Sequence, residues 1–112
     1  MPKAIELLQP RALRVCGIPL DTIRTKIEKS FKLGDRELLA IDRHRDIVIP
    51  RHVFCHFCNS LGYGSSDIAR FLGMHHSTVI HSISKAEELM RREPNLKFHY
   101  NKISRELKEE VA

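Results

Sequence analysis

The sequence has no tryptophan, only three cysteines among its 112 residues, and aromatic residues at just 6% of its positions. Three cysteines are an odd number and too few for a disulfide framework, which excludes a small secreted disulfide scaffold and favours a reducing cytoplasm. No apolar run approaches the roughly 18 residues that a membrane span needs, and the N-terminus does not resemble a signal peptide. At this length we expect one domain, which also excludes a multi-domain enzyme.

Acidic residues are scarce in the middle of a chain that is basic overall. The 19 Lys and Arg residues exceed the 14 Asp and Glu residues, which gives a net charge of +5 before any of the 7 histidines is protonated. Residues 43–85 contain only two acids, Asp46 and Asp67, together with most of the histidines. Because such a surface attracts polyanions, we expect nucleic acid as the partner and a cytoplasmic, nucleoid-associated location.

Hydrophobic residues make up 42% of the chain and recur at helical spacings without alternating for long, which predicts an all-α helical bundle. Proline and glycine interrupt residues 1–20, so we expect an arm or leader there and the folded domain over residues 21–112. The chain's own Met1 and this leader favour a small stand-alone protein over a domain of a larger one.

Residues that start or end helices predict five of them. They run from Asp21 to Gly34, from Pro50 to Leu61, from a cap at Ser65 or Ser66 to Leu72, from about His76 to Arg92, and from Pro94 onwards. We expect Ile47–Ile49 to be extended, because a proline disfavours helix in the residue before it. A polar loop, residues 42–46, precedes that segment.

The third and fourth of these helices carry the residues that a helix-turn-helix requires. Ala69 is small where the two helices would cross closely, Gly73 accepts the positive φ of a tight turn, and Val79 is an apolar anchor at the expected spacing. The alternative interpretation is an ordinary helical hairpin with a polar outside.

The fourth helix is predicted to have an acid-free outer face over its N-terminal half. The inner stripe comprises Val79, Ile83, Ala86 and Met90. The outer face then comprises Thr78, His81, Ser82 and Lys85, preceded by His75, His76 and Ser77. Such a face could enter a DNA major groove, where the phosphates would repel carboxylates.

Two other classes of function stay open. Cys55-His-Phe-Cys58, with His52 nearby, could contribute to a metal site, although such a site needs four ligands and the chain has no second cysteine pair. A helical protein-interaction adaptor would not need an acid-poor surface. We expect no enzyme, because no carboxylate is spaced to orient His81 beside Ser77. We expect no nucleotide and no other cofactor, because no glycine begins a Gly-x4-Gly-Lys-Ser/Thr loop.

The segment Gly73–Met90 resembles the signature of the C-terminal DNA-binding domain of DnaA-type bacterial replication initiators, and Arg43–His52 resembles that domain's basic loop and following helix. The similarity extends from about Asp21 to Lys108. It implies an all-α, TrpR-like fold that binds double-stranded DNA at short, asymmetric, AT-rich boxes, an arrangement compatible with a monomer. It also implies a role in regulating replication initiation or transcription, without the family's nucleotide-hydrolysing module.

The resemblance implies roles for individual residues of the basic segment and the helix after it. Arg43 resembles the arginine that enters the minor groove. Arg51 resembles the arginine that reaches major-groove bases or phosphate. Expected on phosphate are Arg45, His81 and Lys85.

In the recognition helix, the triplet His76-Ser-Thr78 resembles the family's His-Thr-Thr, which contacts the major groove. The sequence departs from the family at several positions. Where the family often has an acidic residue this chain has His75, where glutamine is common it has His52, and where a basic residue is frequent it has Ile49. The segment from Leu61 to His76 is about two residues shorter than usual, so the resemblance does not imply the base preference.

Overall fold

The computed structural model describes residues 18–40 and 45–111, and it contains only helices over those ranges. In chain order they are α3 (Leu20–Ser30), the short 3₁₀ helix η1 (Glu37–Leu39), α4 (Arg45–Ser60), α5 (Ser65–Leu72), α6 (His76–Arg92) and α7 (Pro94–Val111). The all-α fold class is therefore confirmed. Most of the predicted arm, with Arg43 and the rest of 41–44, lies outside the described residues.

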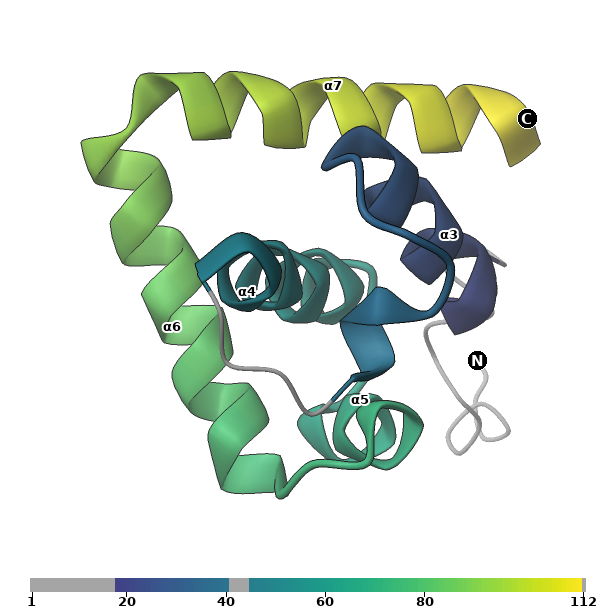
Figure 1. The fold of residues 1–112 in the computed structure, drawn as a ribbon, viewed down its shortest axis with the longest axis vertical. Coiled ribbons are helices and arrows are strands. Elements are labelled where there is room, and N and C mark those ends of the chain that lie inside the picture. The colour runs from purple at the N-terminus through teal and green to yellow at the C-terminus, as the bar shows by residue number, and fades with distance from the viewer. Residues whose placement is uncertain (1–17, 41–44, 112) are drawn as a thin grey trace, which may run out of the picture.

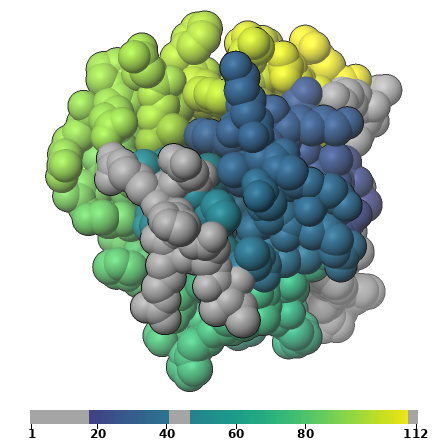
Figure 2. Space-filling model, in the orientation of Figure 1, coloured from purple at the N-terminus to yellow at the C-terminus, as the bar shows by residue number. Residues whose placement is uncertain are grey.

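Helix α4 lies at the centre of the molecule, in contact with α3, α5 and α6 (Figure 1). Helix α6 runs along one side of α4, and α7 turns away from its end to cross α3. In the space-filling view, the segment carrying η1 adjoins α5 on the same face of the molecule (Figure 2). This arrangement leaves the long side of α6 that faces away from α4 open to solvent.

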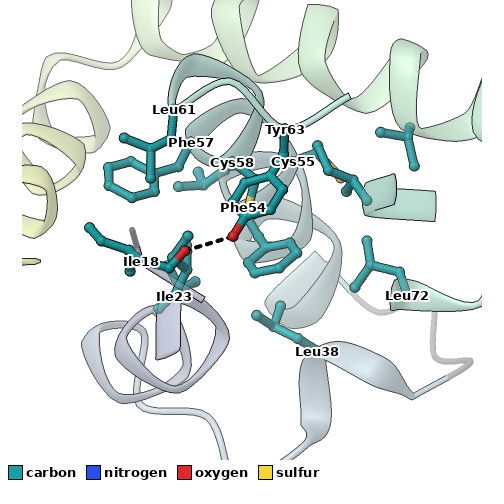
Figure 3. Packing of buried hydrophobic residues seen from close by; sticks show 14 of the residues in the cluster. Ile18, Ile23, Leu38, Phe54, Cys55, Phe57, Cys58, Leu61, Tyr63 and Leu72 are labelled. Carbon is teal, nitrogen blue, oxygen red and sulfur yellow. Dashed lines mark hydrogen bonds between the residues drawn. The ribbon is translucent and has the colours of Figure 1, made fainter. Parts of the chain in front are cut away.

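The core forms around one apolar stripe of α4. Phe54, Phe57 and Cys58 are at most 1% exposed, and Leu61 completes the stripe at 7% (Figure 3). Beyond the helix end, the Tyr63 hydroxyl donates a hydrogen bond to the carbonyl of Ile18 at 2.8 Å, which ties the start of the described chain to this core. Ile103 and Leu107 of α7 are also buried in this core.

The expected extended segment before Pro50 is wrong, because α4 already begins at Arg45 and contains Pro50 in its interior. Ile47 and Pro50 are both buried, and with Val53 and Phe54 they continue one apolar stripe at helical spacing. The proline removes one N–H that would bond to the carbonyl four residues earlier, close to the helix start. Burial of this extra turn against the core outweighs the local steric bias that the sequence prediction relied on.

Three predicted helix ends also differ in detail. Helix α3 ends at Ser30, and Lys32, rather than Gly34, adopts a positive φ of 61° in the turn that follows. Its N-cap is Pro19, while Asp21 accepts a hydrogen bond from Arg24 inside the helix. The N-cap of α5 is Gly64, so neither serine caps that helix. By contrast, the predicted bounds of α6, His76 to Arg92, are confirmed.

Candidate nucleic-acid interface

The predicted helix-turn-helix is present as α5, a turn at Gly73, and α6. Gly73 has φ 71°, the left-handed conformation that the turn requires, and the N–H of Met74 bonds to the carbonyl of Ala69 at 2.9 Å. Ala69 is 5% exposed and Val79 is fully buried. The two helices are therefore packed through the residues that the sequence spacing predicted.

The start of α6 is capped by an imidazole. His75 is the N-cap residue, and its Nδ1 accepts a hydrogen bond from the backbone N–H of Ser77 at 3.3 Å. The Ser77 hydroxyl oxygen lies 2.9 Å from the same nitrogen. No acid occurs in the first turn, and the side chains of His76, Ser77 and Thr78 are exposed there. These three are the residues predicted to contact bases.

The predicted outer face of α6 needs one correction. Ser82 is only 2% exposed, and its hydroxyl forms a hydrogen bond with the thiol of Cys55 on α4. Its position, three residues after Val79 and four before Ala86, places it on the buried side of the helix. Ser82 therefore belongs to the contact between α4 and α6, whereas His81 beside it is exposed.

Sequence reasoning missed Ile80, which is 50% exposed. Among the described residues, it and Phe98 are the only large hydrophobic side chains that are largely exposed. Ile80 follows His76 by four residues and Ser77 by three, so all three share one face of α6. That spacing was the signal available in the sequence, but the sequence prediction assigned Ile80 to neither face of the helix.

A cleft of about 520 Å³ lies between η1, α4 and the α5–α6 turn, on the side of α6 that carries Thr78 and His81. Apolar side chains, including Leu39, Val48 and Met74, form part of its lining. Five of the predicted site residues also line it, namely Arg51, His52, His75, Thr78 and His81. The structure thus brings together residues that lie up to thirty positions apart in the sequence.

His52 is neutral in this environment. Burial lowers the pKa of its imidazole to about 4, and the nearby positive groups of His81, Lys85 and Arg51 act in the same direction. Its Nδ1 is buried, and none of the described residues forms a hydrogen bond with that atom. The side chain is therefore an uncharged, partly exposed hydrogen-bonding group on the wall of the cleft.

Arg51 points its donors at the backbone before α4. Its Nε donates to the carbonyl of Leu38 at 3.1 Å, and its Nη2 donates to the carbonyl of Ala40 at 2.5 Å.

On α6, the basic residues after His81 lie close to acidic side chains. Lys85 Nζ lies 3.5 Å from Glu88 Oε1, so the acid-free part of the helix ends at about this turn. The side chain of Arg45 lies outside the described part of the structure.

The residues of the alternative metal site lie in different surroundings. Cys55 and Cys58 are buried free thiols among the apolar side chains of α4, whereas His52 lines the cleft. Burial raises the pKa of Cys55 to about 12, so it is a protonated thiol rather than a thiolate ligand at neutral pH. Over residues 18–40 and 45–111, no three His, Cys, Asp or Glu side chains group around a point that could hold a metal ion.

In the same described ranges, no helix has the combined length and apolar character that crossing a bilayer requires.

Comparison with known proteins places these features in a family. The family model described as "Bacterial dnaA protein helix-turn-helix" matches residues 20–86. Chromosomal replication initiator protein DnaA of Geotalea daltonii is 33% identical over 92 residues, which are 80% of this chain and 21% of that protein. DnaA of Deinococcus radiodurans is 42% identical over 55 residues, 48% of this chain and 12% of that protein. The chain thus spans about a fifth or less of the length of these relatives, and it belongs to the bacterial DnaA helix-turn-helix family.

Proposed function

We propose that this chain binds double-stranded DNA sequence-specifically through its helix-turn-helix, in the regulation of replication initiation or of transcription. The observation that carries the proposal is the exposed, acid-free first part of α6, held beside the Gly73 turn. In a helix-turn-helix the second helix lies in the major groove with its N-terminal residues on base edges. The sequence of α6 supplies small hydrogen-bonding side chains at those positions.

Individual roles follow from where the side chains lie. His76, Ser77 and Thr78 contact base edges, because they are exposed on the first turn of α6. His81 and Lys85, one and two turns further along, lie where the phosphates that border the groove would pass. From the family resemblance, Arg43 reads the neighbouring minor groove and Arg45 contacts phosphate.

Binding is tested by fluorescence anisotropy with a DnaA-type box and a scrambled duplex of equal composition. We expect the box to bind more tightly, and Arg43→Ala and Thr78→Ala to weaken it. The matched controls are Lys102→Ala, which also removes one positive charge, and Asn101→Ala, which also removes a polar side chain; both lie exposed on α7. Equal binding to both duplexes would contradict the specificity, and no binding to either would favour the adaptor.

The relatives named chromosomal replication initiator proteins favour a role at replication origins over one at promoters. We infer that the chain competes with an initiator for its boxes. Adding the chain to an initiator already bound to a labelled box should displace it in proportion to concentration. Thr78→Ala, which weakens the major-groove contact, should fail to displace the initiator at the same concentration. Simultaneous binding of both proteins to one box would contradict competition.

A further inference from the structure

The imidazole of His75 is held in one orientation at the start of α6. Its Nδ1 lies 3.3 Å from the backbone nitrogen of Ser77 and 2.9 Å from the Ser77 hydroxyl oxygen. A backbone N–H can only donate, so Nδ1 is the acceptor of that hydrogen bond. Both contacts are made by the same ring nitrogen, and together they fix which edge of the ring faces the helix.

The other ring nitrogen of His75 is therefore a donor. An imidazole that accepts at one nitrogen carries its proton on the other, which here is Nε2. The two nitrogens point away from each other across the five-membered ring, so a ring whose Nδ1 faces the helix start directs Nε2–H away from it. His75 is exposed, and none of the described residues forms a hydrogen bond with Nε2. The cap thus leaves one N–H donor available at the surface.

This donor lies where a helix-turn-helix presents side chains to base edges. His75 directly precedes His76, and it lines the same cleft as Thr78, one of the residues to which we assign a base contact. In such a motif the N-terminal residues of the second helix lie against the bases of the major groove. The first turn of α6 contains no acid, so no carboxylate of that turn competes for the donor.

The edge that a base presents in the major groove decides whether it can accept from this N–H. Guanine is the one base that presents two acceptors, N7 and O6, and no donor, whereas cytosine presents only its N4 amino donor. The N–H of His75 opposite cytosine would leave two donors facing each other without a partner. A carboxylate at the same position would have the opposite preference, because it only accepts.

We propose that His75 is a specificity-determining residue, which donates from Nε2–H to the guanine of one G·C pair in the bound site. The inference rests on the proposed DNA-binding function and deepens it, because it gives a base contact to the residue that also caps α6. One side chain then has two roles, since Nδ1 holds the recognition helix and Nε2 contacts the DNA.

The first experiment measures the base preference at each G·C pair of the box. Anisotropy titrations compare the box with duplexes in which one G·C pair at a time is exchanged for C·G, a change that keeps the composition. We expect one exchange to weaken the wild-type protein about three- to tenfold and to change the affinity of His75→Ser less than about twofold. Serine is a good N-cap, so this variant keeps the start of α6 and loses only the ring.

His75→Asp tests the direction of the hydrogen bond. A carboxylate has enough acceptor sites to cap the helix and to accept from a base at the same time. At the pair that the wild-type protein distinguishes, we therefore expect this variant to prefer the exchanged duplex, whatever its overall affinity. A preference of His75→Asp for guanine at that pair would overturn the proposal.

His81→Ser is the matched control. It also replaces an exposed imidazole of α6 by serine, but we assign His81 to phosphate. It should therefore lower the affinity for every duplex by about the same factor, because a phosphate contact carries no base preference. The same uniform loss in His75→Ser would show that the ring of His75 contacts no particular base, and it would overturn the proposal.

These measurements distinguish failure of this inference from failure of the proposed function. If the wild-type protein prefers the box to the scrambled duplex, and His75→Ser keeps the wild-type preference at every G·C pair, only the role of His75 is overturned. If the wild-type protein binds the two duplexes equally, or binds neither, the proposed function is overturned, and the inference with it.

Discussion

Nδ1 of His75 accepts a hydrogen bond from the backbone N–H of Ser77 and so caps the helix that we assign to the major groove. An imidazole nitrogen can accept only while it carries no proton. A protonated ring at this position would lose the cap and place a positive charge at the positive end of the helix dipole. The His75 cap therefore holds the first turn of α6, on which His76, Ser77 and Thr78 are exposed.

The first prediction concerns the pH dependence of DNA binding. We expect tighter binding at pH 6 than at pH 8, by about threefold, because a proton gained by an exposed imidazole beside phosphate adds attraction. The groups concerned are His76 and His81, both exposed on α6. His81→Ala should reduce the ratio of the two dissociation constants, which anisotropy titrations at both pH values measure.

His75→Asp is the matched control for this prediction. Aspartate is a good N-cap, so α6 keeps its start, and binding should stay tighter at pH 6 through His76 and His81 even though overall affinity falls with the added negative charge. Equal affinities of the wild-type protein at the two pH values would contradict the prediction.

The second prediction concerns stability and His52. Its pKa is about 4 in the folded protein against an ordinary value of 6.5, so the unfolded chain binds a proton first as the pH falls. The corresponding stability is fully present above pH 6.5 and is lost between pH 6.5 and 4. Because the ring is partly exposed, we expect a loss of about 1–2 kcal/mol in the free energy of unfolding.

His52→Gln removes this titration while keeping a polar side chain. As the pH is lowered from 7 to 4.5, the free energy of unfolding, measured with urea, should therefore fall less in the variant than in the wild type. His76→Gln removes an exposed histidine and is the control for a general effect of histidine loss. Parallel pH profiles of stability for His52→Gln and the wild-type protein would show that burial does not lower the pKa of this ring.

The fold was largely predictable because most helix signals were local. The inner stripe of α6, the turn glycine and Pro94 placed α6 and the start of α7 correctly, since each signal lies within one helix or at its end. Pro50 was the exception. Its local effect favours extended backbone before it. The segment is nevertheless helical, because Ile47 and Pro50 are buried against the rest of the core, and that burial depends on residues distant in the sequence.

The site was less predictable, because side-chain direction on a helix changes by 100° per residue. A small error in the assumed orientation of α6 placed Ser82, which is buried, on the outer face, and it left Ile80, which is exposed, assigned to neither face. The partners of Arg51 were beyond sequence reasoning for another reason. They are backbone carbonyls 13 and 11 residues away. Because every residue has a backbone carbonyl, the residue type does not indicate which carbonyl accepts a hydrogen bond.

The third prediction concerns salt. With about four to six phosphate contacts, log K should fall with log[salt] at a slope of roughly −4 to −5, because binding releases condensed counterions. Lys85→Ala should reduce the size of the slope by about one, whereas Lys102→Ala on α7 should leave it unchanged. A slope near zero would mean that the acid-poor surface does not follow the DNA backbone.

The last prediction concerns Ile80 and the thymine methyl group. An apolar side chain on a base-reading face can contact the methyl that distinguishes thymine in the major groove, which suits an AT-rich box. We expect Ile80→Ala to weaken binding about three- to tenfold with little change in stability, because the side chain is half exposed. Phe98→Ala, which truncates the other exposed large hydrophobic residue on α7, should leave DNA affinity unchanged.

Single replacements of thymine by deoxyuridine in the box locate the contact, since each deletes one methyl group and nothing else. At the thymine that Ile80 touches, the replacement should weaken the wild-type protein and have no further effect on Ile80→Ala. If every replacement weakens both proteins equally, Ile80 does not read a methyl group. If Ile80→Ala binds as tightly as the wild type while Thr78→Ala does not, the base-reading face is the side of α6 that lines the cleft, and it does not include Ile80.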